Sequence, residues 1–330
     1  MLLSVQYLRA FASFLVVMSH IAFKLEVNSD AILSGYNVGG YGVDLFFIIS
    51  GFIMCLTVDK KNPNIITFFK DRIIRIIPLY WITTSAALIV YLYDPKLINS
   101  SGGETSVLSS YMLIPDGHKF LNNNGWTLSY EFYFYAIFSI CLLFREYRKI
   151  ICSLMLFTIP FIGLLIESDN PITKFLMSSF LLEFFMGILC YFIINKINIK
   201  PIYSVVIFSI GILILFYVNN SGIPDVIFGR ALTMGITMSL IFVGFVSLED
   251  KLPDIPFLYK AGDSSYSLYL THPFVLSLST LIMSALSILD NTVFYMLLML
   301  GLSYIVSWYS YILLEKPIDR AIKHFKCRNY

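Results

Sequence analysis

Residues Leu8 to Phe23 read LRAFASFLVVMSHIAF, an apolar run that is long enough to cross a bilayer but carries Arg9 near one end and His20 near the other. At helical geometry, the step from Arg9 to His20 is about 16 Å of rise and about 1100° of rotation, three turns plus about 20°. The two side chains therefore lie on one helix face at different depths. A titratable side chain inside a span normally faces the protein interior or a cavity, so we expect other spans to pack around this face.

The composition of the whole chain is typical of a polytopic membrane protein. Hydrophobic residues make up 58% of the 330 residues, and the mean hydropathy is +0.77. These values exclude an ordinary soluble domain. The net charge of +2 gives no reason to expect a nucleic-acid partner, whereas membrane lipids are expected ones. The five cysteines lack CxxC spacing, so we expect neither a disulfide framework nor a metal site.

Apolar runs of spanning length predict an all-α fold, a bundle of ten transmembrane helices. They are placed near residues 4–23, 41–58, 78–93, 126–144, 150–166, 172–194, 202–218, 228–248, 264–287 and 291–313. With both termini in the cytoplasm, seventeen Lys and Arg residues fall in inner segments and five in outer ones, as the positive-inside rule requires. We expect residues 1–330 to form a single membrane-embedded domain with a short cytoplasmic tail over about 314–330.

Two connections are longer than turns. Residues 64–77, NIITFFKDRIIRII, alternate apolar and basic residues and predict an amphipathic helix on the cytoplasmic membrane surface. The outer segment 94–125 is the longest loop and is a candidate lid or recognition loop.

Three polar residues fall in one depth band near the outer surface: His20, Asp44 and Glu131. A histidine within reach of a carboxylate is the usual arrangement of a general base whose tautomer is fixed by its partner. The alternative is a hydrogen-bonded structural histidine, with Asp44 an ordinary interfacial carboxylate.

A second group falls near the cytoplasmic face: Arg9, Arg72, Arg75, Glu315 and His272, eight residues into the ninth span. Clustered guanidinium groups suit a polyphosphate ligand, but anchoring to anionic lipids explains Arg72 and Arg75 equally well. Glu315 can simply neutralise Arg9, and His272, which precedes a proline, can be a kink residue that is satisfied by a backbone carbonyl.

Two further features lie at mid-membrane. Glu183, in the sixth span, is a functional candidate to which the sequence assigns no role, because a buried carboxylate is either protonated or paired. The Ser50–Gly51 pair in the second span is explained by close helix packing as readily as by function.

Taken in order, these stretches resemble the acyltransferase-3 family of membrane O-acyltransferases, and their order and spacing make the resemblance specific. The matching strings are SVQYLRAFASFLVVMSH, GVDLFFIISGFIM, FFKDRIIRIIPLYW, GWTLSYEFYFY, LLEFFMG, SYSLYLTHPFV and LLEKP. The resemblance is strongest to exopolysaccharide-production and O-antigen O-acetyltransferases that consist of the membrane domain alone. We accordingly expect no additional C-terminal domain.

The resemblance implies roles for several residues. An arginine, ten intervening residues and a histidine mark the family's first span, matched by Arg9 and His20, and the histidine is held to be essential for acyl transfer. Paired arginines before the third span, here Arg72 and Arg75, are implicated in handling the acyl donor. Glu315 matches the glutamate that closes the last common span.

The function implied is transfer of an acyl group, expected to be acetyl, from cytoplasmic acetyl-CoA to a hydroxyl of a surface polysaccharide or lipid-linked glycan, in the bacterial inner membrane and without a metal. His20 acts as general base or carries the acyl group transiently, with Glu131 or Asp44 orienting its ring. Two other functions are open: a membrane transporter and a non-catalytic partner in polysaccharide export. The absence of internal repeats speaks against the transporter.

Overall fold

The computed structural model is helical throughout the residues that it describes, apart from turns, loops and one isolated β-bridge between Thr105 and Lys119. The described residues are 2–27, 35–36, 38–98, 102–166, 168–224, 226–285 and 292–321. The predicted all-α membrane fold is confirmed at this level. Parts of the expected outer loop, of the ninth and tenth spans and of the tail lie outside the described residues, at 99–101, 286–287, 291 and 322–330.

The chain divides into two compact units. The first comprises residues 1–49 and 192–316, and the second comprises residues 50–191 and 317–330. The chain passes between the units inside helix α2 (Gly42–Lys61), inside helix α9 (Leu181–Lys196) and after Lys316.

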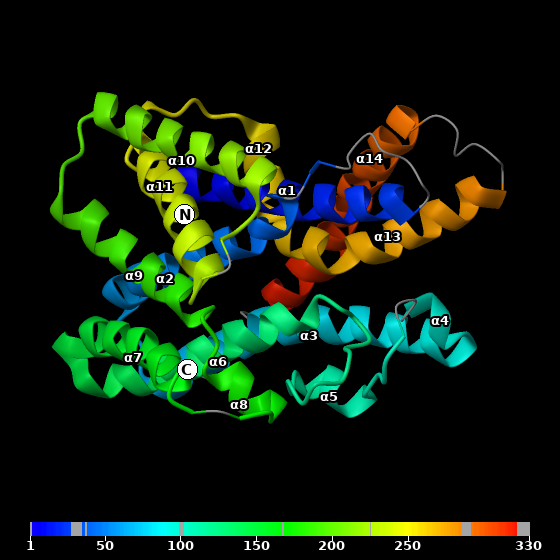
Figure 1. Ribbon diagram of the computed structural model, residues 1–330, viewed down its shortest axis with the longest axis horizontal. Coiled ribbons are helices and arrows are strands. Elements are labelled where there is room, and N and C mark those ends of the chain that lie inside the picture. Colours follow the sequence, from blue (N-terminus) through cyan, green and yellow to red (C-terminus); the bar gives the residue numbers. More distant parts are fainter. Residues whose placement is uncertain are drawn as a thin grey trace. The chain divides into compact units, whose positions relative to one another are not determined.

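The centre of the first unit is α1 (Leu3–Val27), the helix that carries Arg9 and His20. It contacts the short helices η1 (Val38–Tyr41) and α12 (Pro256–Asp263), and the long helices α13 (Ser265–Ala285) and α14 (Thr292–Ser310). Figure 1 shows α13 and α14 in orange beside the blue α1. Other helices therefore surround α1, as the sequence predicts.

The beginning of α1 is held by side chains from a distant part of the chain. The Glu249 carboxylate accepts the backbone N–H groups of Leu3 and Ser4 at 2.6 and 2.8 Å, and Gln6 donates to Asp263 at 2.5 Å. First-turn N–H groups have no partner within their own helix, so Glu249 satisfies two of them. These contacts fix α1 against the segment that leads into α12.

Helices α10 (Pro201–Ser221) and α11 (Ile236–Val246) complete the first unit as a closely packed pair. A Cβ on Gly244 would lie 2.5 Å from the Phe208 nitrogen, so the two backbones touch where this glycine lies. A π-helical turn, η3 (Ala231–Gly235), precedes α11.

In the second unit, α3 (Ile65–Tyr93) is one continuous helix with Pro78 inside it. It covers both the predicted surface helix and the predicted third span, which the sequence analysis treats as separate elements. Its first half packs against α6 (Gly125–Cys141): Phe68 stacks on Phe138 with ring centroids 5.4 Å apart. The surface position of residues 64–77 stays a prediction.

The expected outer loop packs against α3. It contains α4 (Pro95–Ile98) and α5 (Val107–Met112). The Tyr80 hydroxyl donates to the Ser110 carbonyl at 2.6 Å, and the Trp81 indole donates to the Tyr111 carbonyl at 3.0 Å. Since Tyr80 lies about 20 Å along the helix from Tyr93, the loop folds back over much of the second half of α3.

Seven helical segments within the described residues are long and apolar enough to cross a membrane. They are Leu3–Glu26, Val38–Lys61, Ile65–Tyr93, Gly125–Gly163, Pro171–Lys196, Pro201–Ser221 and Thr292–Ala321. A multi-pass membrane protein is thus supported, whereas the count of ten stays a prediction. Gly125–Gly163 joins two predicted spans, α6 and α7 (Arg148–Gly163), across the short η2 (Leu142–Tyr147), where Arg145 has φ 40° and ψ −100°.

Three predicted boundaries differ in the structure. The sixth predicted span is two helices, α8 (Pro171–Leu176) and α9 (Leu181–Lys196). The eighth is the shorter apolar helix Ala231–Val246. The last helix continues through the π-turn η5 (Tyr311–Glu315) to residue 321, beyond the expected start of the tail.

Candidate functional site

His20 lies beside a second histidine in the first unit. The rings of His20 on α1 and His272 on α13 have centroids 5.0 Å apart and cross at 66°. The sequence places His20 in the outer depth band and His272 in the cytoplasmic group, whereas the two rings are neighbours in the structure. The alternative that it binds a backbone carbonyl is confirmed: its Nδ1 lies 2.8 Å from the Leu268 oxygen.

The two helices that carry the histidines also contribute to an apolar cluster. His272 is fully buried, and His20 is partly exposed. The cluster is built from α1, α13 and α14 and includes Val17, Met18, Ile21, Leu25, Leu268, Leu276, Met283, Tyr295 and Met299. In such a low-dielectric setting a hydrogen bond is stronger than in water, so a polar contact to either ring has a large effect on its orientation.

Asp44, the predicted partner of His20, is held by another residue. Arg230 donates to both oxygens of the fully buried Asp44 carboxylate, at 3.1 and 2.7 Å, and to the Gly40 carbonyl at 3.3 Å. The Arg230 guanidinium also lies 5.2 Å from the centre of the Tyr41 ring. This bidentate pair engages the Asp44 carboxylate on both of its oxygens.

Arg9 and Glu315 both belong to the first unit. Arg9 is buried, with 8% of its surface exposed. Glu315 accepts a hydrogen bond of 2.6 Å from the Ser267 hydroxyl on α13. Their mutual neutralisation stays a prediction.

In the second unit, Glu131 and Arg72 both contact Tyr135. The Tyr135 hydroxyl donates to Glu131, which also accepts a 2.9 Å hydrogen bond from Ser50. The Arg72 guanidinium lies 5.9 Å from the centre of the Tyr135 ring and 5.7 Å from that of Phe68. Glu131 and Arg72, which the sequence places near opposite membrane faces, thus contact the same side chain, because the first half of α3 packs against α6.

The two arginines of α3 differ in exposure. Arg75 is exposed, whereas Arg72 is buried and its Nε has no hydrogen-bond partner in the described part of the chain. A buried polar group without a partner calls for an explanation. A ligand phosphate is a partner of fitting chemistry for this guanidinium.

Glu183 lies in the first turn of α9 and is fully buried. A position in the middle of the sixth span is expected from the sequence, but the helix breaks before Leu181, so Glu183 lies at a helix N-terminus, where the helix dipole favours a negative charge. Close packing explains the neighbouring glycine: a Cβ on Gly51 would lie 2.3 Å from the Phe184 oxygen.

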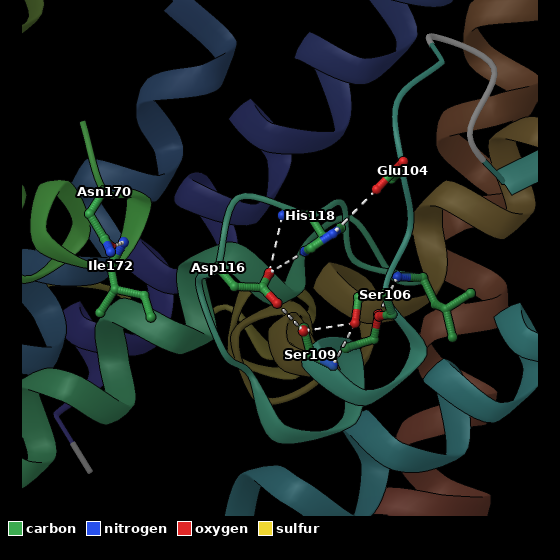
Figure 2. Close-up of polar contacts among 9 residues, drawn as sticks. Glu104, Ser106, Ser109, Asp116, His118, Asn170 and Ile172 are labelled. Atoms are coloured by element: carbon green, nitrogen blue, oxygen red, sulfur yellow. Dashed lines mark hydrogen bonds and ion pairs between the residues drawn. The ribbon is translucent and has the colours of Figure 1, made fainter.

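The loop between α4 and α6 carries its own polar network (Figure 2). Asp116 accepts from the Ser109 hydroxyl at 2.5 Å and lies 3.1 Å from His118 Nδ1, and His118 Nε2 lies 3.5 Å from Glu104. The bond from Ser109 lowers the pKa of Asp116 below its usual range, and the bonds from His118 act in the same direction. The network ties residues 104–109 of the loop to residues 116–118.

Residues 2–312 match the acyltransferase domain. The chain belongs to the acyltransferase-3 family. It is a membrane acyltransferase, and the first unit holds the arginine and histidine that carry the resemblance.

Three relatives illustrate the range of the family. This acyltransferase is 27% identical over 300 residues to the exopolysaccharide production protein ExoZ of Rhizobium meliloti, covering 86% of this chain and 91% of ExoZ. It is 25% identical over 311 residues to the O-acetyltransferase OatA of Staphylococcus aureus, covering 80% of this chain and 49% of OatA. It is 31% identical over 154 residues to the acyltransferase MdmB of Streptomyces mycarofaciens, and the match covers 43% of this chain and 39% of MdmB. No solved structure matches the chain.

Sequence reasoning did not single out Arg230 or Tyr135. Arg230 stands at the start of a predicted span, so the rule that flags intramembrane charges could have identified it. Tyr135 follows Glu131 by four residues, the spacing of neighbours on one helix face. Its contact with Arg72 could not be predicted, because it depends on how α3 and α6 pack.

Proposed function

We propose that this acyltransferase moves an acetyl group from cytoplasmic acetyl-CoA to a hydroxyl of a cell-surface polysaccharide or lipid-linked glycan. The observation that carries the proposal is the family match over residues 2–312, which includes His20 on the surrounded helix α1. The names of ExoZ and OatA support a glycan acceptor and an acetyl group. We also propose that the protein lies in the bacterial inner membrane, that both of its termini are in the cytoplasm, and that both units act as one domain.

His20 is assigned the role of general base. A neutral imidazole nitrogen takes the proton of the acceptor hydroxyl while the hydroxyl oxygen attacks the thioester carbonyl. The carbon–sulfur bond breaks, and the proton passes from His20 to the departing CoA thiolate. His20 is partly exposed, whereas the neighbouring His272 is fully buried, and this difference favours His20 as the ring that an entering hydroxyl reaches.

Arg72 and Arg75 are assigned to the phosphate groups of acetyl-CoA, and the donor role of Arg9 stays a prediction from the sequence. Guanidinium groups bind phosphate oxygens through two parallel hydrogen bonds. The partnerless Nε of Arg72 supports this assignment. Glu131 then acts on the donor side, since it holds Tyr135, whose ring lies against Arg72.

The test is the O-acetyl content of surface glycan, measured by proton NMR in a deletion strain that is complemented with wild type, His20→Ala or His324→Ala. His324 belongs to the expected cytoplasmic tail, has no assigned role in transfer, and is the matched control. We expect wild type and the control to restore the acetyl signals and His20→Ala to leave them absent. Unchanged acetylation in the deletion strain would overturn the assigned acceptor, and full rescue by His20→Ala would overturn its catalytic role.

A further inference from the structure

His272 has a defined tautomer. A carbonyl oxygen only accepts hydrogen bonds, so the 2.8 Å contact with Leu268 requires a proton on Nδ1 of His272. The neutral ring then carries its lone pair on Nε2. This atom is buried and has no hydrogen-bond partner among the residues that the structure describes.

His272 is suited to remain neutral. A second proton would place a charge on a fully buried ring, and a charge that is removed from water is strongly disfavoured. The ring is therefore a fixed hydrogen-bond acceptor, oriented by the backbone of its own helix.

The nearest ring to this acceptor is His20. A centroid separation of 5.0 Å brings facing ring atoms within hydrogen-bonding distance when their nitrogens turn toward each other. Asp44 is already bound at both oxygens by Arg230.

We propose that His272 is the positioning residue for His20. In this arrangement Nε2 of His272 accepts a hydrogen bond from one ring nitrogen of His20, and the other nitrogen of His20 keeps its lone pair for the acceptor hydroxyl. The chain Leu268 carbonyl, His272, His20 does what a carboxylate does for many catalytic histidines. The inference rests on the proposed function of His20.

Two substitutions at position 272 distinguish a role of His272 in orienting His20 from a role in the fold alone. His272→Gln places an amide oxygen near the position of Nε2, whereas His272→Asn places a donor near the position of Nδ1 and keeps only the bond to Leu268. With purified protein in liposomes, CoA release from acetyl-CoA is measured with glycan from the deletion strain as acceptor.

We expect His272→Asn to lower kcat about 10–100-fold, the usual effect of losing an orienting partner, with the KM for acetyl-CoA unchanged. His272→Gln is expected to retain most of the activity. Equal loss in both variants, or full activity of His272→Asn, would overturn the proposal.

A second readout needs no turnover. The chain has four histidines, so nitrogen-15 histidine labelling gives few signals, and His20→Asn assigns those of His20. We expect one neutral tautomer of His20 in wild type and a mixture in His272→Asn. Identical tautomer populations would overturn the proposal. If wild type transfers no acetyl group, the proposed function fails, while this readout still decides whether His272 orients His20.

Discussion

Asp44 and Arg230 form a bidentate ion pair in which the carboxylate is fully buried and the Arg230 side chain is partly exposed. Removing one partner of a fully buried pair costs about 3–5 kcal/mol, and we expect a smaller loss here because water reaches Arg230. Asp44→Asn should therefore lower the melting temperature of the detergent-solubilised protein by several degrees.

The matched control for this change is Asp169→Asn. Asp169 pairs with Lys174 at 3.0 Å, but the pair is fully exposed, and such pairs contribute little. We expect its melting temperature to equal that of wild type. If Asp44→Asn keeps its stability but loses kcat, Asp44 acts on His20 and the structural account of the Arg230 pair is wrong.

Tyr135 gives a second prediction at the scale of the residue. Tyr135→Leu removes both the ring beside Arg72 and the hydroxyl on Glu131, whereas Tyr135→Phe keeps the ring. Because a cation–π contact is worth roughly 0.5–2 kcal/mol, we expect the KM for acetyl-CoA to rise about threefold to tenfold in Tyr135→Leu and less in Tyr135→Phe. Steady-state kinetics would contradict the donor-side assignment if kcat fell in both variants with KM unchanged.

Individual residues were predicted better than their partners. Arg9, His20, Asp44, Arg72 and Glu131 stand out in the sequence because each is ionisable and lies in or next to an apolar run. The sequence-based grouping then rested on how far each residue lies from the end of its predicted span. It did not predict the contact of Arg72 with Tyr135 or of His272 with His20, because packing between helices determines which side chains meet.

At the level of the helices, Gly51 holds α2 against α9. A Cβ there would meet backbone atoms, at 2.3 Å from the Phe184 oxygen and 3.1 Å from the Gly187 Cα, so the helices would have to separate. Overpacking of this kind costs about 1–3 kcal/mol, and Gly51→Ala should lower the melting temperature. Gly301→Ala is the control, because nothing lies within 4 Å of its Cβ position. A melting temperature for Gly51→Ala equal to that of the control would contradict the close contact.

The loop network makes a pH-dependent prediction. Because the pKa of Asp116 is lower in the folded protein, its contribution to loop stability is complete above the ordinary aspartate pKa of about 3.9 and is lost as the pH falls through the lowered value. Ser109→Ala removes the largest cause of the shift. At neutral pH we expect faster amide exchange over residues 104–121 in Ser109→Ala, measured by mass spectrometry. Unchanged exchange would show that the Ser109–Asp116 bond does not order the loop.

The positions of several helices could be predicted from the sequence, but the places where helices break or continue could not. Sustained apolar runs indicated the positions of α1, α2, α10 and α13 within a few residues. The continuity of α3 was missed because its first half contains Lys70, Arg72 and Arg75, a pattern that also fits a surface helix. In the structure Arg72 is instead accommodated by the aromatic rings of Phe68 and Tyr135.

For the molecule as a whole, the distribution of basic residues predicts which connections face the cytoplasm. We expect a membrane-impermeant maleimide to label Lys96→Cys in intact cells and Lys200→Cys only after lysis. The wild-type chain is the background control, because four of its cysteines are buried. Labelling of Lys200→Cys in intact cells would reverse the proposed orientation.

Transfer across the membrane, dependent on His20, is the central claim for the molecule. Inside-out membrane vesicles expose the cytoplasmic face to the medium and enclose the glycan acceptor. With radiolabelled acetyl-CoA added outside, we expect label on the enclosed glycan with wild type and none above background with an equal amount of His20→Ala. Equal labelling by the two proteins would contradict the account.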